Sequence, residues 1–197
     1  MAANYTTLKP HAAKSPHSYA HKLRTARLGL WLFFISDAFM FAGLLVARFY
    51  LLPGHRPELE QFVGLIVTSV LLISSFFMNR AEVNISQGNQ KSFVRNTIIT
   101  MVLGIAFLVG VLGVEWRLAP FGPGDGPAGA GFYMMTGMHA FHVLTGVIFL
   151  AIVIRNGARG RYSAEKHWAV EAAANYWHFV DLVWIFFYPA LYLIGKL

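Results

Sequence analysis

The chain has 197 residues, of which 56% are hydrophobic and 15% are aromatic, and its mean hydropathy is +0.52. Charged residues make up only 13% of the chain, against roughly 25% in a soluble domain, and this combination indicates an integral membrane protein. Because the chain has no cysteine, disulfides, thiolate metal sites and cysteine nucleophiles are excluded.

Residues 1–27 are rich in Lys, Arg and His and have no hydrophobic helical face, which predicts a basic cytoplasmic N-terminal tail. Five apolar segments follow, each close to the roughly 20 residues that a helix needs to cross the hydrocarbon core. The expected fold class is an all-α integral membrane protein, with one five-helix transmembrane domain over residues 28–197. The expected spans are about 28–52, 62–78, 94–114, 132–154 and 174–194.

Lys and Arg are distributed unequally between the two sides of such a bundle. The side opposite the tail holds only four of the 16 Lys and Arg residues: Arg48, Arg56, Arg117 and Lys196. The positive-inside rule then places the N-terminus in the cytoplasm and the C-terminus outside. The net charge of +7 is therefore a topology signal and a contact surface for anionic lipid, and no nucleic-acid partner is expected.

The last apolar segment carries polar residues on one helical face. At about 100° per residue, His167, Glu171, Asn175, His178 and Asp181 fall within an arc of about 120°. Uncompensated polar groups are costly in hydrocarbon, so this face is expected to point towards protein.

Two acids stand out in the other segments. Asp37 lies within the first span, where it is either a functional acid or a hydrogen-bonded carboxyl group that fixes helix packing. Glu115 lies at the outer end of the third span beside Trp116 and Arg117, which favours an interfacial ion pair. A buried role for Glu115 would need a partner from another helix.

Three intramembrane histidines suggest two further alternatives. His139 and His142 are three residues apart and are expected to share a helical face, and His178 lies in the next span. They could ligate a metal or haem, with Asp181 as an outer carboxylate. Alternatively, these four residues form a hydrogen-bonded lock between the fourth and fifth helices.

Four motifs then give a resemblance to a known family. They are WLFFISDAFMF in the first span, LGIAFLVGVLGVEW in the third, TGMHAFHVLTG in the fourth and EAAANYWHFVDLVWIFFYPALY in the last. In this order and spacing, the chain resembles subunit III of the haem-copper terminal oxidases over nearly all of residues 28–197. It resembles a five-helix form, without the two N-terminal helices of the seven-helix form.

The resemblance implies an accessory subunit with no catalytic residues and no bound metal, packed against subunit I and other oxidase subunits that carry haem and copper. It also implies bound phospholipid and a role in assembly and sustained proton uptake. Asp37 occupies the position of a reactive glutamate of the family, and the family's polar positions are matched by Glu115, His139, His142, Glu171, His178 and Asp181. Head-group candidates for anionic lipid are Arg155, Arg159, Arg161 and Lys166.

Several alternatives remain open at this stage. The electron donor of the complex is expected to be cytochrome c, but aspartate at position 37 also resembles the quinol-oxidising branch, and a nitric-oxide-reductase-associated complex is a third alternative. Outside the family, the chain could be a stand-alone membrane cytochrome or a proton-coupled carrier that uses Asp37 and Asp181. The expected location is a bacterial plasma membrane, with the chain as a multi-pass protein.

Overall fold

The computed structural model describes residues 16–52, 54 and 59–195, and these are almost entirely helical. Within these ranges, β-pairing is limited to an isolated bridge between Ser163 and Lys166, which confirms the expected all-α class. The long helices are α1 (Pro16–Leu51), α2 (Gln61–Ser86), α3 (Gln90–Leu108), α5 (Gly126–Ala158) and α6 (Trp168–Tyr188). Short helical turns extend two of them: η1 (Val109–Glu115) and α4 (Trp116–Leu118) follow α3, and η2 (Pro189–Leu193) follows α6.

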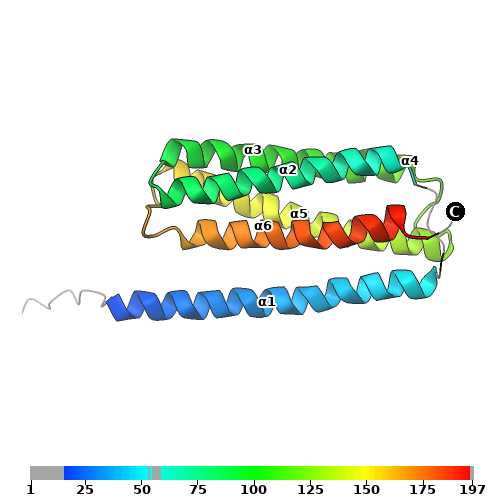
Figure 1. Ribbon diagram of the computed structural model, residues 1–197, viewed down its shortest axis with the longest axis horizontal. Helices are drawn as coiled ribbons and strands as arrows, with labels where there is room; N and C mark the ends of the chain where they lie inside the picture. The colour runs from blue at the N-terminus through cyan, green and yellow to red at the C-terminus, as the bar shows by residue number, and fades with distance from the viewer. Residues whose placement is uncertain (1–15, 53, 55–58, 196–197) are drawn as a thin grey trace, which may run out of the picture.

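The long helices lie side by side, and each runs opposite to the one before it (Figure 1). Helix α1 lies at one edge of the bundle. Helix α6 packs against α1, α2 and α5, so it occupies a central position. The side chains of α6 therefore contact more of the other helices than those of any helix at the edge can.

Trp177 of α6 fills the centre of the bundle and determines where small residues are required. Its indole Nε1 donates a hydrogen bond to Ser74 Oγ of α2 over 2.9 Å. Its ring lies against Gly104 of α3 and Gly146 of α5, and a Cβ added at Gly146 would lie 3.0 Å from ring atoms. Close helix approach at small residues is common in membrane bundles, and these two glycines provide the space for Trp177.

Four helical segments in the described part of the chain are long and apolar enough to cross a membrane: Ala20–Leu51, Gln61–Ser86, Gln90–Leu118 and Gly126–Ala158. Helix α6 is not among them, because the polar residues of its stripe lower its hydropathy. The helices also extend beyond the apolar segments expected from the sequence. Helix α2, for example, ends at Ser86 rather than near residue 78, since main-chain hydrogen bonds continue where side chains become polar.

The N-terminal boundary also differs from the expected one. Helix α1 begins at Pro16, inside the segment 1–27 that the sequence predicts to be a tail. The rest of that predicted tail, residues 1–15, lies outside the described residues.

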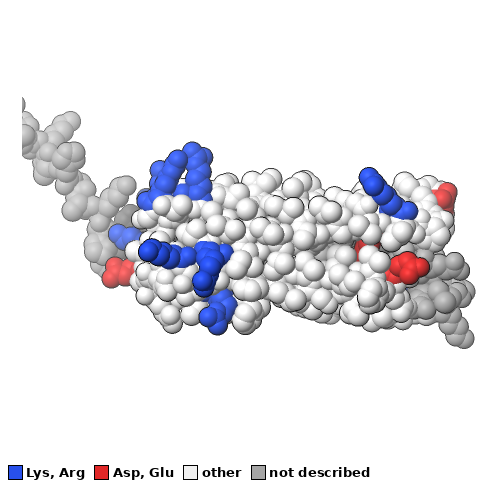
Figure 2. Space-filling view, turned by 90° about the horizontal axis from the view of Figure 1, so that it is seen from above, with Lys and Arg blue, Asp and Glu red and all other residues white. Residues whose placement is uncertain are grey.

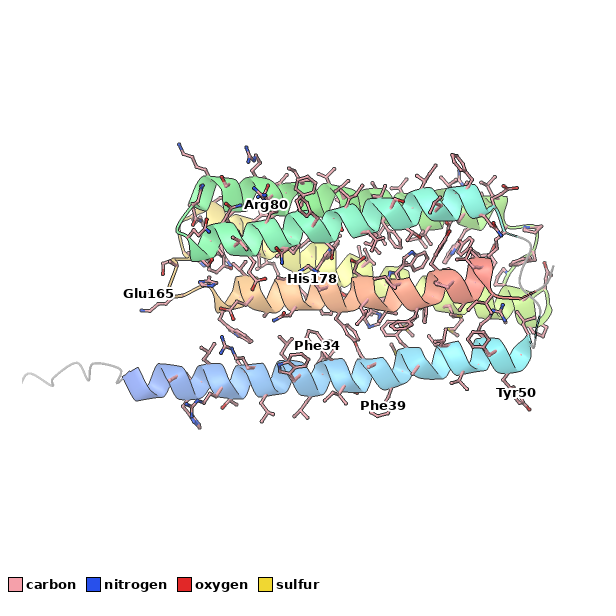
Figure 3. All side chains as sticks on the ribbon, in the orientation of Figure 1. Phe34, Phe39, Tyr50, Arg80, Glu165 and His178 are labelled. Atoms are coloured by element: carbon pink, nitrogen blue, oxygen red, sulfur yellow. The ribbon has the colours of Figure 1, made fainter. Side chains whose placement is uncertain are left out.

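The outer surface of the bundle is apolar. Figure 3 shows Phe34 directed from α1 towards α6, whereas Phe39 and Tyr50 point away from the bundle. The Phe39 residue is 75% exposed and Tyr50 84% exposed. A surface of this kind is expected in lipid, where apolar side chains meet hydrocarbon and every main-chain polar group is bonded within a helix.

Lys and Arg residues gather at the end of the bundle where α1 begins (Figure 2). We call this the basic end. At the opposite end, the described Lys and Arg residues are Arg48 and Arg117. The basic end carries Lys22, Arg24, Arg27, Arg80, Lys91, Arg95, Arg155, Arg159, Arg161 and Lys166.

Candidate functional site

Asp37 of α1 meets His142 of α5 inside the bundle. The distance between Asp37 Oδ2 and His142 Nε2 is 3.3 Å, and the two side chains are 17% and 9% exposed. The other ring nitrogen, His142 Nδ1, lies 2.8 Å from the main-chain oxygen of Met138. The Phe41 ring stands edge-on to the imidazole, with 4.8 Å between ring centroids. The acid expected from the sequence thus has a partner, and that partner is one of the expected histidines.

A hydroxyl pair holds the main chain at His142. Thr145 Oγ1 donates to the His142 carbonyl oxygen over 2.8 Å, and the Tyr176 hydroxyl group of α6 donates to the same oxygen over 3.1 Å. The two hydroxyl oxygens are 2.6 Å apart. Helices α1, α5 and α6 therefore meet at one polar cluster, which the sequence did not reveal because Thr145 and Tyr176 belong to common helix-packing residue types.

His178 bonds to α2 rather than to α5. Its Nδ1 lies 2.8 Å from Ser75 Oγ, and Figure 3 shows His178 on the side of α6 that faces α2. Asp181 lies beside the same hydroxyl group, and its Oδ1 is buried without a hydrogen-bond partner in the described part of the chain. The lock expected between the fourth and fifth helices is thus replaced here by a contact between α6 and α2.

His139 is enclosed by aromatic rings. It is fully buried at 0% exposure, with the Trp184 ring centroid 4.7 Å away and that of Phe107 at 5.5 Å. Neither ring nitrogen has a hydrogen-bond partner among the described residues. His139 and His142 share a helix but contact different neighbours. Within the described ranges, no group of three or more His, Asp or Glu side chains is arranged to hold a metal ion.

Glu115 lies at the opposite end of the bundle, between two π-helical turns. It ends η1, and Tyr192 of η2 donates a hydrogen bond to Glu115 Oε2 over 2.8 Å. Glu115 is only 5% exposed, so it is a buried acid with a partner from another helix. The sequence favoured an interfacial ion pair between Glu115 and Arg117. In the structure the Glu115 carboxyl group is instead buried and bonded to Tyr192.

Glu171 belongs to a different cluster, at the basic end. Arg27 of α1 donates from Nη2 to Glu171 Oε2 over 3.1 Å, and His167 Nε2 lies 3.3 Å from Glu171 Oε1. The Arg27 guanidinium group also lies over the Trp168 ring, 5.4 Å from its centroid. Asn175, one turn further along, is exposed. The polar residues of the α6 stripe therefore face different neighbours: Glu171 contacts α1, His178 contacts α2, and Asn175 lies on the outer surface.

The four basic residues expected to contact lipid are exposed at the basic end, on the last turn of α5 and in the loop that follows. Beside them a groove of about 520 Å³ runs between α1, α5 and α6. Its walls are almost entirely apolar, with Phe33, Phe149 and Tyr176 among them, and Asn156 and Trp168 also line it.

Comparison with known proteins identifies the family. The family model described as cytochrome c oxidase subunit III matches residues 10–196. The chain belongs to the cytochrome c oxidase subunit III family. Curated cytochrome c oxidase subunit 3 proteins of Dugong dugon and Gadus morhua are each 36% identical to it, and that of Scyliorhinus canicula is 35% identical. Each comparison covers 86% of this chain and 70% of the relative.

Membership of the subunit III family confirms the resemblance given by the four motifs. The structure adds the partners that these motifs do not contain. Ser75 bonds to His178, and Tyr176 bonds to the main chain at His142. Tyr192 bonds to Glu115. Sequence reasoning missed these three residues, since a lone Ser or Tyr in an apolar helix gives no sign of the acid or imidazole across from it.

Proposed function

We propose that this subunit III chain is the accessory, non-redox subunit of a proton-pumping haem-copper terminal oxidase, a cytochrome c oxidase of aerobic respiration. The observation that carries the proposal is the family match over residues 10–196. The relatives are named as subunit 3 of cytochrome c oxidase, so the partners proposed here are oxidase subunit I and the remaining oxidase subunits.

The intramembrane histidines do not fit haem or copper ligation. Both ring nitrogens of His142 are engaged, one by a carbonyl oxygen and one by Asp37. His178 bonds to Ser75, and the His139 ring is enclosed by Trp184 and Phe107. Haem and copper are accordingly assigned to partner subunits, and the stand-alone cytochrome is set aside.

In the proposed topology, α6 with η2 forms a fifth crossing, and the basic end faces the cytoplasm. Two observations support this topology. Helix α6 lies alongside the four apolar helices (Figure 1), and Lys and Arg are concentrated at the end where α1 begins (Figure 2). Positive charge is retained on the cytoplasmic side of membranes. The assignment to a bacterial plasma membrane stays a prediction, and the relatives named above are animal proteins.

For proton uptake, we propose that Asp37 is the acid through which the chain acts. The contact between Asp37 and His142 supports this role, because both side chains lie between helices and each keeps a small exposed fraction. Ionisable groups at such depth are rare because they are costly. Asp37 is not proposed as a catalytic residue; it would sustain proton delivery to the catalytic subunit.

For lipid, we propose that the apolar groove beside α5 holds acyl chains and that Arg155, Arg159, Arg161 and Lys166 hold anionic head groups. Two observations support this role: the groove is almost wholly apolar, and the four side chains are exposed beside it. Basic side chains at the cytoplasmic surface attract anionic lipids by roughly 1 kcal/mol each.

Purification of the tagged chain under mild solubilisation tests the proposed function. We expect a large haem-containing subunit to copurify, while the chain separated from it has no Soret absorption band. A Soret band in the isolated chain, or a purified complex without any haem protein, would overturn the proposal. A copurifying subunit with a copper-binding cysteine pair would identify cytochrome c as donor, and a complex lacking it would favour quinol.

A further inference from the structure

The hydrogen bonds of His142 determine which of its ring nitrogens carries hydrogen. Nδ1 lies 2.8 Å from the Met138 carbonyl oxygen, and a carbonyl oxygen can only accept a hydrogen bond. Nδ1 must therefore bear a hydrogen and donate it. In a neutral imidazole the other nitrogen then has a lone pair and no hydrogen, so Nε2 of neutral His142 is an acceptor.

Nε2 faces a carboxyl group that also needs a donor. Asp37 Oδ2 lies 3.3 Å from His142 Nε2. This oxygen is buried and has no hydrogen-bond partner in the described part of the chain, so His142 Nε2 is the polar group that faces it. With a neutral ring and an ionised carboxylate, two lone pairs would face each other and a buried charge would be unpaired, which is strongly unfavourable.

We propose that Asp37 and His142 hold one proton between them and act as a single intramembrane proton-binding site. The proton lies either on Asp37, which then donates from Oδ2–H to Nε2, or on His142, which then donates from Nε2–H to the carboxylate. Transfer between the two changes no net charge, because both forms are neutral overall. Gain or loss of a proton would leave a net charge, which hydrocarbon disfavours.

The surroundings of the pair keep the ring in this orientation. The Phe41 and Phe141 rings lie at 4.8 and 5.6 Å from the imidazole, both edge-on. The titratable groups nearest the pair from other positions are His139, one turn away on α5, and Tyr176 on α6. The Tyr176 hydroxyl group is bonded to Thr145 and to the His142 carbonyl oxygen. Its hydrogen is therefore not the one held between Asp37 and His142.

This inference goes beyond the proposed function, because it assigns His142 as the partner of Asp37 whether or not Asp37 supports proton uptake. It can be tested by ¹⁵N nuclear magnetic resonance of the full-length chain, labelled at histidine, in lipid nanodiscs. The His142 signal is assigned with the variant His142→Gln. We expect Nε2 to give the signal of a hydrogen-bonded nitrogen.

In Asp37→Leu the proton partner is removed, and we expect the Nε2 signal to shift to that of a pyridine-type nitrogen without a hydrogen bond. The His178 signal should stay unchanged, since His178 bonds to Ser75 on the other side of α6; it serves as the internal check that the variant is folded. An Nε2 signal of a pyridine-type nitrogen without a hydrogen bond in the unmodified chain would overturn the inference even if the variant did not fold. An Nε2 signal identical in the folded Asp37→Leu variant would overturn it as well.

Discussion

The Tyr192 hydroxyl group donates a hydrogen bond to Glu115 Oε2 over 2.8 Å, and this bond joins the two π-helical turns η1 and η2. Both residues are buried, and Glu115 Oε1 has no hydrogen-bond partner in the described ranges. Tyr192 is therefore the donor that compensates the burial of this carboxyl group. A Cβ at Gly64 of α2 would lie 2.7 Å from the Tyr192 ring, so α2 packs directly against the same side chain.

Replacement of the donor should destabilise this end of the bundle. In Tyr192→Phe the Glu115 carboxyl group stays buried without a donor, which costs about 1–3 kcal/mol. We expect a lower apparent melting temperature of the purified chain in detergent. Tyr188→Phe is the matched control, because Tyr188 stacks on Tyr192 with 5.2 Å between ring centroids but is only partly buried. An equal loss of stability in both variants would count against a specific role of the Tyr192 hydroxyl group.

The contact between α6 and α2 should be needed for assembly. His178→Leu would leave Ser75 without its imidazole partner, and Ser75→Ala would leave His178 without its hydroxyl partner. Each change should lower stability by about 1–3 kcal/mol and reduce recovery of the subunit with the complex. Ser69→Ala is the control, because Ser69 is exposed on the same helix and its hydroxyl group donates to the Leu65 carbonyl oxygen of that helix. Normal recovery of Ser75→Ala and His178→Leu would show that this contact is dispensable.

Asp37→Asn should separate proton handling from assembly. The asparagine amide group can still donate a hydrogen bond to His142 Nε2, so the helices stay packed and the haem content of the complex is retained. The variant cannot release a proton, and we expect slower proton uptake or a shorter catalytic lifetime during turnover. Glu165→Gln, in the exposed loop at the basic end (Figure 3), is the control for loss of one negative charge. Complete loss of haem in Asp37→Asn would contradict the accessory role.

The space around Trp177 gives a prediction about packing. Gly104→Ala would place a methyl group too close to the edge of the Trp177 ring, and such overpacking costs about 1–3 kcal/mol. Gly43→Ala on α1 is the matched control, since nothing lies within 4 Å of a Cβ there. Both changes raise helix propensity by about 1 kcal/mol, so the difference in melting temperature isolates the steric effect. Equal behaviour of the two variants would show that Trp177 can move aside.

Native mass spectrometry can test the head-group residues. Removal of the four charges at Arg155, Arg159, Arg161 and Lys166 by substitution with Gln should reduce the number of anionic phospholipids that stay bound. Arg117→Gln, in α4 at the opposite end of the bundle, should leave lipid binding unchanged. Full retention of anionic lipid in the fourfold variant would refute head-group binding by these residues.

Much of the fold could be predicted from the sequence, because apolar length and motif order depend on local composition. The positions of α1, α3 and α5 follow from their apolar runs, and the family follows from four motifs. Helix ends were less predictable, as α1 and α2 show, since a helix continues after its hydrophobic side chains stop. The hydrogen bonds of α6 at Ser75 and Tyr176 depend on distant segments, and periodicity alone cannot supply them.

The histidines show why partners are harder to predict than faces. Residues three apart on a helix differ in direction by roughly 60°, which is enough for His139 to meet Trp184 of α6 while His142 meets Asp37 of α1. The stripe on α6 behaves in the same way. Its polar residues share one broad face, yet Glu171 bonds to Arg27 of α1 and His178 to Ser75 of α2.

Helix α1, at the edge of the bundle, is held by polar contacts at three levels. Arg27 bonds to Glu171 at the basic end, Asp37 meets His142 inside the bundle, and Arg48 donates to the Ile194 carbonyl oxygen at the opposite end over 3.3 Å. Sliding α1 by one turn, or rotating it by one residue, would break all three at once. A peripheral helix with this attachment is locked in register, so the subunit presents the same row of outward side chains, including Phe39 and Tyr50, to whatever surrounds it in the membrane.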